Sequence, residues 1–189
     1  MNLQEALLSR RTVYRFEARD VPPSVLSAAF EAARWAPCHK HTNPWRFYEL
    51  GPQIREKLLP LTTSLAKQKA AGLPPAQVEK GVAKAIGKIR DVPVLVAVTS
   101  ARSVDDAFRE KEDYAATTCA IHNWVLSLWG EGVGAQWSTG KITRHEATYE
   151  VLGIDPLREE LVGFLKAGYP TKVPSPPKKT LQEVLVQLN

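Results

Sequence analysis

Cysteine is scarce in this chain: only Cys38 and Cys119 occur among its 189 residues. Two cysteines cannot build the disulfide framework of a small secreted domain, so we expect a reducing compartment, the cytoplasm. Residues 1–5 place no cationic segment before an apolar run, and the sequence therefore predicts no secretory signal. With 44% hydrophobic and 24% charged residues, the composition is that of a globular protein, and we expect a single domain over residues 1–189.

Charged side chains are missing from Tyr114 to Gly130, a stretch without Asp, Glu, Lys or Arg. Asp105 and Asp106 lie eight to nine residues before this stretch and suit a helix start, where carboxylates accept hydrogen bonds from free amides. We therefore expect a central helix over 105–130. Because its faces lack charge, we expect other elements to cover it on every side, with Cys119 and His122 packed in the core. The uncharged part is shorter than the roughly 20 residues of a membrane span and holds several polar groups, which argues against a membrane helix.

Apolar periodicity predicts the other elements. Leu3–Ser9 should form a helix whose leucines turn inward, and Ser24 and Thr143 should be the N-caps of two later helices. The remaining expected segments are helices at 53–69, 77–90 and 180–188 and strands at 46–50, 92–99 and 160–167. Residues 169–177 contain four prolines and should be extended, as an arm lying across a partner subunit.

Glycines at 72, 81 and 87 interrupt the helical pattern between two of these segments. Two interpretations of residues 72–90 stay open: a mobile lid over a site, or a plain surface connection.

A basic segment follows the first helix. Arg10, Arg11 and Thr12, with Arg15 close behind, bring three guanidinium groups and a hydroxyl within six residues. Guanidinium groups bind phosphate oxygens with two hydrogen bonds, so the segment suits an anion. The alternative is a solvated basic turn.

The loop over residues 36–45 is dense in polar and aromatic groups, and it allows three interpretations. Cys38, His39 and His41 could bind a metal together with Cys119 and His122, but adjacent ligands and unfamiliar spacings disfavour this, and we predict no metal site. Cys38 could be a thiol nucleophile, although no orienting partner accompanies it. The third interpretation makes His39 and Asn43 hydrogen-bonding groups around a planar ligand, with Trp35 or Trp45 as an apolar wall.

A net charge of +5 would suit either nucleic acid or a phosphate-bearing cofactor. A basic module that binds nucleic acid would gather its Lys and Arg with exposed aromatic residues on one face. Here the lysines are scattered and the aromatic residues lie in apolar runs, so we keep this module as the alternative and expect no nucleic-acid partner.

Four blocks of the chain resemble the nitroreductase family of FMN-dependent oxidoreductases. Arg10-Arg11-Thr12 resembles its Arg-Arg-Ser signature, and Ala36-Pro37 through Phe47 resembles its Ala-Pro-Ser…Gln-Pro-Trp-x-Phe loop. Gly132–Ala135 with Trp137, and Leu165–Pro170, resemble the remaining blocks. The order and spacing agree from about Leu3 to Pro170, and the short length resembles the compact, single-domain branch.

The resemblance implies a three-layer α+β fold: a central mixed or antiparallel sheet, a long central helix, and surrounding helices. It also implies a cytoplasmic homodimer with two FMN sites, each lined by both chains, that passes two electrons from NAD(P)H to nitroaromatics, quinones or related acceptors by a ping-pong mechanism. It names no catalytic side chain. The family positions that contact the cofactor correspond to Arg10, Arg11, Thr12, Trp35, His39, Trp137, Ser138, Thr139 and Gly140. Trp35 and His39 would reach it from the partner subunit, and Lys178 or Lys179 could add to the phosphate site.

The chain departs from the family pattern at three positions. Tyr14 stands where many members have a basic residue, a role that Arg15 could take. Asn43 replaces the usual Gln, and Cys38 replaces a small hydroxyl residue. The nature of the acceptor and the choice between NADH and NADPH are therefore left open by the sequence.

Overall fold

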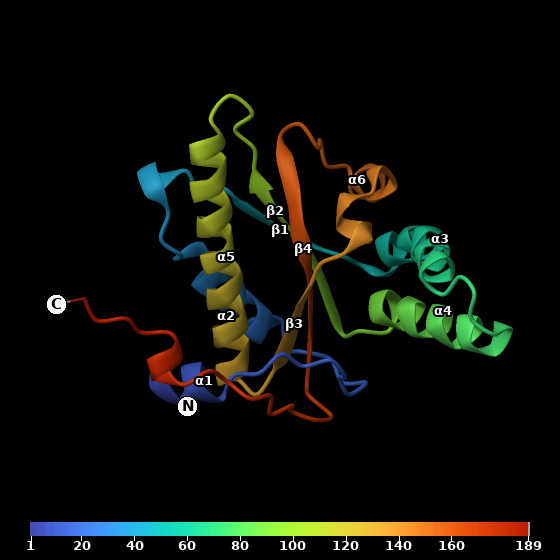
Figure 1. The fold of residues 1–189 in the computed structure, drawn as a ribbon, viewed down its shortest axis with the longest axis horizontal. Helices are drawn as coiled ribbons and strands as arrows, with labels where there is room; N and C mark the ends of the chain where they lie inside the picture. The colour runs from blue at the N-terminus through green and yellow to red at the C-terminus, as the bar shows by residue number, and fades with distance from the viewer. Residues whose placement is uncertain (189) are drawn as a thin grey trace.

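The computed structural model describes residues 1–188, and it has three layers built around one antiparallel sheet (Figure 1). The sheet contains β1 (Trp45–Glu49), β2 (Val94–Ala101), β4 (Glu159–Gly168) and β3 (Gly134–Ser138), in the order β1-β2-β4-β3. All neighbouring strands are antiparallel. The expected α+β class is confirmed, and the sheet is antiparallel rather than mixed.

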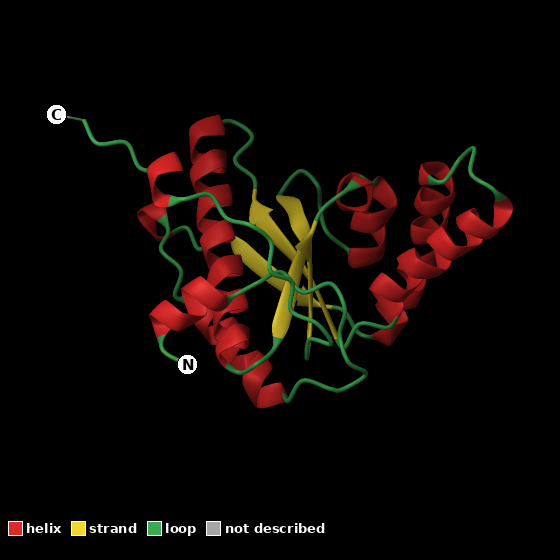
Figure 2. Ribbon diagram, turned by 60° about the horizontal axis from the view of Figure 1, so that its bottom comes forward, coloured by secondary structure: helices red, strands yellow, loops and turns green. Residues whose placement is uncertain are grey.

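Helices cover both faces of the sheet (Figure 2). One face packs against α2 (Pro23–Arg34) and α5 (Ala107–Gly130), with α1 (Leu3–Ser9) near the end of α5. The other face packs against α3 (Pro52–Lys69) and α6 (Glu146–Leu152), while α4 (Pro75–Arg90) pairs with α3. Because both faces are covered, β2 and β4 are buried almost throughout and read as apolar runs.

The long helix α5 begins and ends close to the expected residues. Asp106 is its N-cap and accepts a hydrogen bond from the Arg109 amide at 2.9 Å. One side of α5 packs on the sheet and on α2 through fully buried Trp124 and Leu128. The expectation of a long central helix is therefore confirmed.

Two of the expected N-caps are wrong. The second helix starts two residues earlier than expected, with Pro22 as N-cap and Pro23 at the first helical position, so Ser24 lies inside the helix and caps nothing. Proline suits this position because its fixed φ is helical and the missing N–H has no partner there anyway. Thr143 lies in a short 3-10 turn, η2 (Lys141–Arg144), and the α6 cap is His145, which accepts from the Ala147 amide through Nδ1.

The two ends of the chain are more exposed than expected. In α1 only Ala6 is buried, whereas Leu3 and Leu8 are 70% and 68% exposed. Residues 171–180 run without regular structure, as predicted for the arm, but the closing helix is wrong: only a 3-10 turn, η3 (Leu181–Glu183), forms there. Nothing covers the apolar side chains of 181–188, and a short helix without packing is only marginally stable.

Residues 72–90 fold mainly into α4, which makes an antiparallel hairpin with α3 at one side of the molecule (Figure 1). Within residues 1–188, no helix is both long enough and apolar enough to cross a bilayer.

Candidate functional site

The basic segment after α1 lies along the outer edge of β3. Thr12 bridges Ala135 in parallel orientation, and the Val13 amide donates to the Ala135 carbonyl at 3.0 Å. The approach is close because residue 134 is glycine: a Cβ there would lie 2.4 Å from Val13 Cγ2. Two segments about 120 residues apart in the sequence thus lie side by side at one edge of the sheet.

The three anion-binding candidates in this segment differ in availability. All three are half-buried. Arg11 Nη1 already donates to the carbonyls of Leu8 and Arg10, at 2.7 and 2.8 Å, which fixes the end of α1. Arg10 forms no side-chain hydrogen bond or ion pair within residues 1–188, so its guanidinium is the better group for an incoming anion.

Arg10 also faces α5. Burial, and then the positive charge of Arg10, lower the pKa of His122 from its ordinary value. Both causes favour a neutral imidazole next to the guanidinium. His122 therefore adds no second positive charge beside Arg10.

The C-terminal end of β3 carries the other residues that the resemblance assigns to the cofactor. Trp137 packs on Gly163 of β4, where a Cβ would come within 2.3 Å of the indole Nε1, and this Nε1 donates to the Val162 carbonyl at 3.3 Å. Ser138 Oγ donates to the Phe164 carbonyl at 3.1 Å. Gly140 has φ +147, which side-chain-bearing residues rarely adopt. Beyond Ala135, no strand of residues 1–188 pairs with the outer edge of β3, so its backbone is open to a ligand.

Trp35 and His39 make their contacts on α2 and α5 and not on β3. Trp35 ends α2, is 73% exposed, and donates to Glu31 at 2.8 Å. His39 Nδ1 lies 2.8 Å from Glu112 near the start of α5, whereas Arg10 acts on His122 ten residues further along. At 1.5 Å per residue, that separation is about 15 Å along the helix.

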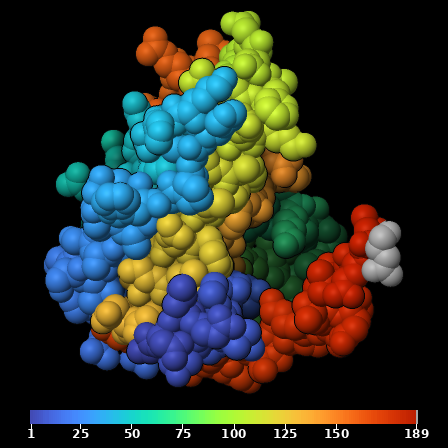
Figure 3. All heavy atoms as spheres, turned by 90° about the vertical axis from the view of Figure 1, so that its left-hand side faces the viewer, coloured from blue at the N-terminus to red at the C-terminus, as the bar shows by residue number. Residues whose placement is uncertain are grey.

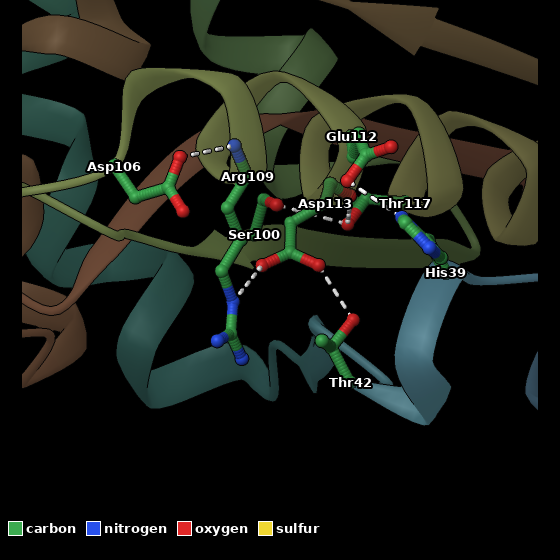
Figure 4. A network of polar contacts seen from close by, with 8 residues as sticks. All are labelled: His39, Thr42, Ser100, Asp106, Arg109, Glu112, Asp113 and Thr117. Atoms are coloured by element: carbon green, nitrogen blue, oxygen red, sulfur yellow. Dashed lines mark hydrogen bonds and ion pairs between the residues drawn. The ribbon is translucent and has the colours of Figure 1, made fainter.

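A polar network holds the His39 loop against α5 (Figure 4). Asp113 is buried and accepts from Thr42 Oγ1 at 2.5 Å, with Arg109 Nε at 3.7 Å. One turn later, Thr117 Oγ1 donates to Ser100 Oγ of β2 at 3.0 Å. The loop is therefore anchored by a carboxylate that cannot reach bulk water, and such a carboxylate requires its donors.

The backbone of the same loop is strained. Lys40, His41 and Asn43 all have positive φ, at 52°, 53° and 46°. Such conformations cost free energy in residues other than glycine and gather at functional sites. Together with the network, these conformations mark the loop that carries His39 as a candidate part of the functional site.

The expectation that α5 is covered on every side is wrong for the single chain. Figure 3 shows α5 open to view on one face of the molecule. Cys119 and His122, expected in the core, are exposed there, as is Ala115. These residues repeat every three or four positions, so they form one uncharged stripe along the helix, which we call the α5 stripe: Ala115, Thr118, Cys119, His122 and Leu126.

The metal-ligand interpretation receives no geometric support. Within residues 1–188, no three His, Cys, Asp or Glu side chains are grouped as metal ligands would be. Cys38 Sγ lies 3.7 Å from the Asn43 side-chain oxygen, and His39 faces a carboxylate instead of a thiol.

Two residues near the site were not predicted from the sequence. Gly163 makes room for Trp137, a role that only the β3–β4 register reveals. Lys166 in β4 is 6% exposed, and its one sequence signal is a lysine within the apolar run Leu161–Ala167. Burial, and then the charge of Lys88, lower the pKa of Lys166 to about 8.

The geometry defines a class of protein: a three-layer α+β domain with a cationic segment on an open sheet edge and an uncovered helix stripe. Comparison with known proteins identifies the class. The sequence pattern of the nitroreductase family matches residues 7–169. The chain belongs to the nitroreductase family.

Individual relatives are similar to this protein over nearly its whole length. A Bacillus subtilis protein named "Putative NAD(P)H nitroreductase YfhC" is 28% identical over 178 residues, covering 94% of this chain and 89% of its own. The nitroreductase-like family protein from Bacillus cereus superposes with a TM-score of 0.83 at 25% identity, covering 100% of this chain and 96% of its own. A Desulfovibrio desulfuricans protein, solved in complex with FMN, has the same fold, with a TM-score of 0.75 at 22% identity. The match covers 100% of this chain and 98% of that protein.

Proposed function

We propose that this protein is an FMN-dependent oxidoreductase that passes two electrons from NAD(P)H to nitroaromatics, quinones or related acceptors in a ping-pong cycle. The observation that carries the proposal is the pairing of the Arg10–Thr12 segment with the open edge of β3. This pairing joins an anion-binding end to a strand whose outer backbone is free, which suits a ligand with a phosphate and a flat ring.

The donors on this edge fit FMN. Arg10 would bind the phosphate as an unpaired guanidinium, and Thr12 would add a hydroxyl. Ser138, Thr139 and Gly140 would border the ring, with Trp137 held in place behind β3 by its bond to Val162. Bound FMN supplies hydride chemistry of its own, so the chain has to hold it, exclude water and leave one face open.

We further propose that the active species is a homodimer that buries the α5 stripe. His39 lies apart from the Arg10–Thr12 edge of its own chain, beside Glu112, and both Trp35 and His39 are exposed. An uncharged helix stripe next to exposed aromatic side chains is typical of an interface. Across such a dimer, Trp35 and His39 of one chain would complete the cofactor site of the other.

In this arrangement the chain would work by positioning. NAD(P)H and the acceptor would occupy the same open space in turn, and neither needs a strong general acid from the protein. His39 is held by Glu112, and the Asp113 network fixes its loop, so the wall supplied by the partner would be rigid. The cytoplasm is the compartment that supplies both nicotinamide nucleotides, and we place the protein there.

The first experiment is purification. We expect yellow protein containing one FMN per chain, a dimeric mass by light scattering, and bleaching when NADH or NADPH is added without oxygen. Initial rates at several acceptor concentrations should give parallel double-reciprocal lines. Colourless protein that does not bind added FMN would refute the proposal, and oligonucleotide retardation by that protein would favour the nucleic-acid module instead.

A variant tests the dimer. Ala115→Glu places a charge in the middle of the α5 stripe and should give a monomer that loses FMN. Ala76→Glu makes the same change at an exposed site in the first turn of α4 and should stay dimeric and yellow. A dimeric, fully loaded Ala115→Glu protein would show that the stripe is not the interface.

A further inference from the structure

The positive charge of this protein is concentrated in one hairpin. Residues 52–91, which contain α3, α4 and the turn between them, hold eight Lys and Arg against three Asp and Glu, a net charge of +5. This equals the net charge of the whole chain, so the rest of the chain is neutral on balance. From Lys57 to Val78 there is no Asp or Glu at all. The antiparallel hairpin therefore gathers lysines that are spread out in the sequence.

The lysines of this hairpin are exposed and unpaired. The half-buried residues of α4 repeat every three or four positions and face α3, whereas Lys80, Lys84 and Lys88 form an exposed stripe on another side of the helix. Lys67 and Lys69 are exposed at the end of α3. Within residues 1–188 every ion pair involves Arg or His, and no lysine takes part in one. The ammonium groups are therefore available to an external anion.

The two arginines of the hairpin are engaged within the fold. Arg55 donates to backbone carbonyls at the base of the hairpin, including that of Val92 at 2.5 Å, and Arg90 pairs with Asp91 at 2.8 Å. Residues 52–91 also contain no Phe, Tyr or Trp. Nucleic-acid surfaces typically combine free arginine with aromatic side chains that stack on bases, so this surface does not suit nucleic acid. The available cations are lysines, which bind phosphate as point charges.

The tip of the hairpin is uncharged and exposed. Residues 71–76, Ala-Gly-Leu-Pro-Pro-Ala, are all exposed, and Leu73 is 50% exposed. Lys69 is the last residue of α3 and Lys80 is the sixth of α4, so lysines lie within about one and a half turns of the tip on both helices. One exposed leucine is ordinary by itself. An apolar tip flanked by lysines, with no acid between them, is typical of segments that lie at the surface of an anionic bilayer.

The hairpin stays accessible in the dimer proposed above. It projects from the side of the molecule opposite to α5 in both ribbon views (Figure 1, Figure 2). The α5 stripe can therefore meet a second copy of the chain while the tip of the hairpin remains uncovered.

We propose that the α3–α4 hairpin docks this protein on the surface of a bilayer that contains anionic lipids. The hairpin lysines contact the headgroup phosphates, and Leu73 enters the boundary between headgroups and acyl chains. The protein lies on the bilayer and does not cross it, since no helix of residues 1–188 is suited to span one. This docking goes beyond the proposed oxidoreductase function and does not depend on which acceptor is reduced.

The test is sedimentation of the purified protein with vesicles made of equal parts phosphatidylglycerol and phosphatidylcholine. We expect the wild type to bind these vesicles at low salt, to bind less as salt screens the charges, and not to bind vesicles of phosphatidylcholine alone. A lysine near an anionic surface strengthens binding by about fivefold, so Lys69→Gln/Lys80→Gln should bind about 25-fold more weakly. Leu73→Ser should also bind more weakly, because the tip loses its apolar side chain.

Lys111→Gln/Lys172→Gln is the matched control. It removes the same charge from exposed positions on α5 and in the arm after β4, and it should bind nearly as the wild type does. Equal losses in the two double variants would show that net charge attracts the protein, and they would overturn the proposal. A wild type that stays in solution beside anionic vesicles would overturn it too, and an unchanged Leu73→Ser protein would exclude insertion of the tip.

Two further measurements complete the test. The substituted side chains are exposed, so every variant should fold as the wild type does, which circular dichroism verifies. Retardation of an oligonucleotide that is lost in Lys69→Gln/Lys80→Gln, in a protein that binds no vesicles, would assign the hairpin to nucleic acid and refute membrane docking.

Discussion

Replacement of Gly163 by alanine tests how tightly β4 and Trp137 fit together. The new Cβ would lie 2.3 and 2.6 Å from Nε1 and Cδ1 of Trp137 and 3.0 Å from the Ser138 carbonyl oxygen. Ordinary carbon contacts are about 3.5–4.0 Å, so the indole has to move by roughly 1 Å or more. Overpacking of this kind costs about 1–3 kcal/mol.

The expected cost translates into a measurable change in melting temperature. For a chain of this size, 1 kcal/mol corresponds to about 2–4 °C, so Gly163→Ala should lower the melting temperature by roughly 2–12 °C. Circular dichroism would follow unfolding, and tryptophan fluorescence would report a displaced Trp137. FMN affinity should fall as well, because the indole would lose its bond to Val162.

Gly81→Ala is the matched control. Gly81 lies inside α4, a Cβ added there would meet nothing within 4 Å, and its φ is unexceptional. Alanine in a helix interior should raise stability by about 0.5–1 kcal/mol. A Gly163→Ala protein that melts with the wild type, with unaltered fluorescence and FMN affinity, would refute the packing argument.

Three further predictions concern single interactions. Thr42→Val removes the 2.5 Å donor from buried Asp113 and should cost about 1–3 kcal/mol in urea unfolding; a cost near zero would mean that the network does not anchor the loop. Asp106→Ala should cost about 1 kcal/mol through the lost N-cap, whereas Ser24→Ala should cost less than about 0.5 kcal/mol, and equal losses would contradict the observed caps. Arg10→Met should raise the pKa of His122 in an NMR titration, since the Arg10 charge lowers it. An unchanged pKa would show that the charge of Arg10 does not act on His122. The pKa of His122 is higher in the unfolded chain than in the folded one, so the unfolded chain binds the proton first as the pH falls. The free energy of unfolding should therefore decrease as the pH drops below the ordinary histidine range, and it should decrease less in Arg10→Met.

The elements with local signals were predictable. The start of α5 follows from an acidic N-cap, and its length follows from the uncharged run. The N-caps of α2 and α6 were not predictable, because neighbouring residues competed for each position. Pro23 fixes the start of α2, and the ring nitrogen of His145 caps α6. The C-terminal segment has helical periodicity but nothing to pack against, so propensity alone did not produce a helix.

Burial was harder to predict than secondary structure. The absence of charge around Cys119 and His122 suggested a covered helix, yet the fold leaves them exposed. An uncharged surface looks the same in sequence whether its own chain or a second copy covers it. The bridge between Thr12 and β3 and the place of Lys166 both depend on the pairing of distant strands, which no local pattern encodes.

The contact between Val13 and residue 134 makes two distant positions interdependent. Any side chain at 134 would push the N-terminal segment off the sheet, and only a smaller residue at 13 could absorb it. Consider a recombined chain that takes its first twenty residues from one parent and β3 from another. It would keep the basic segment in register only if residues 13 and 134 come from the same parent.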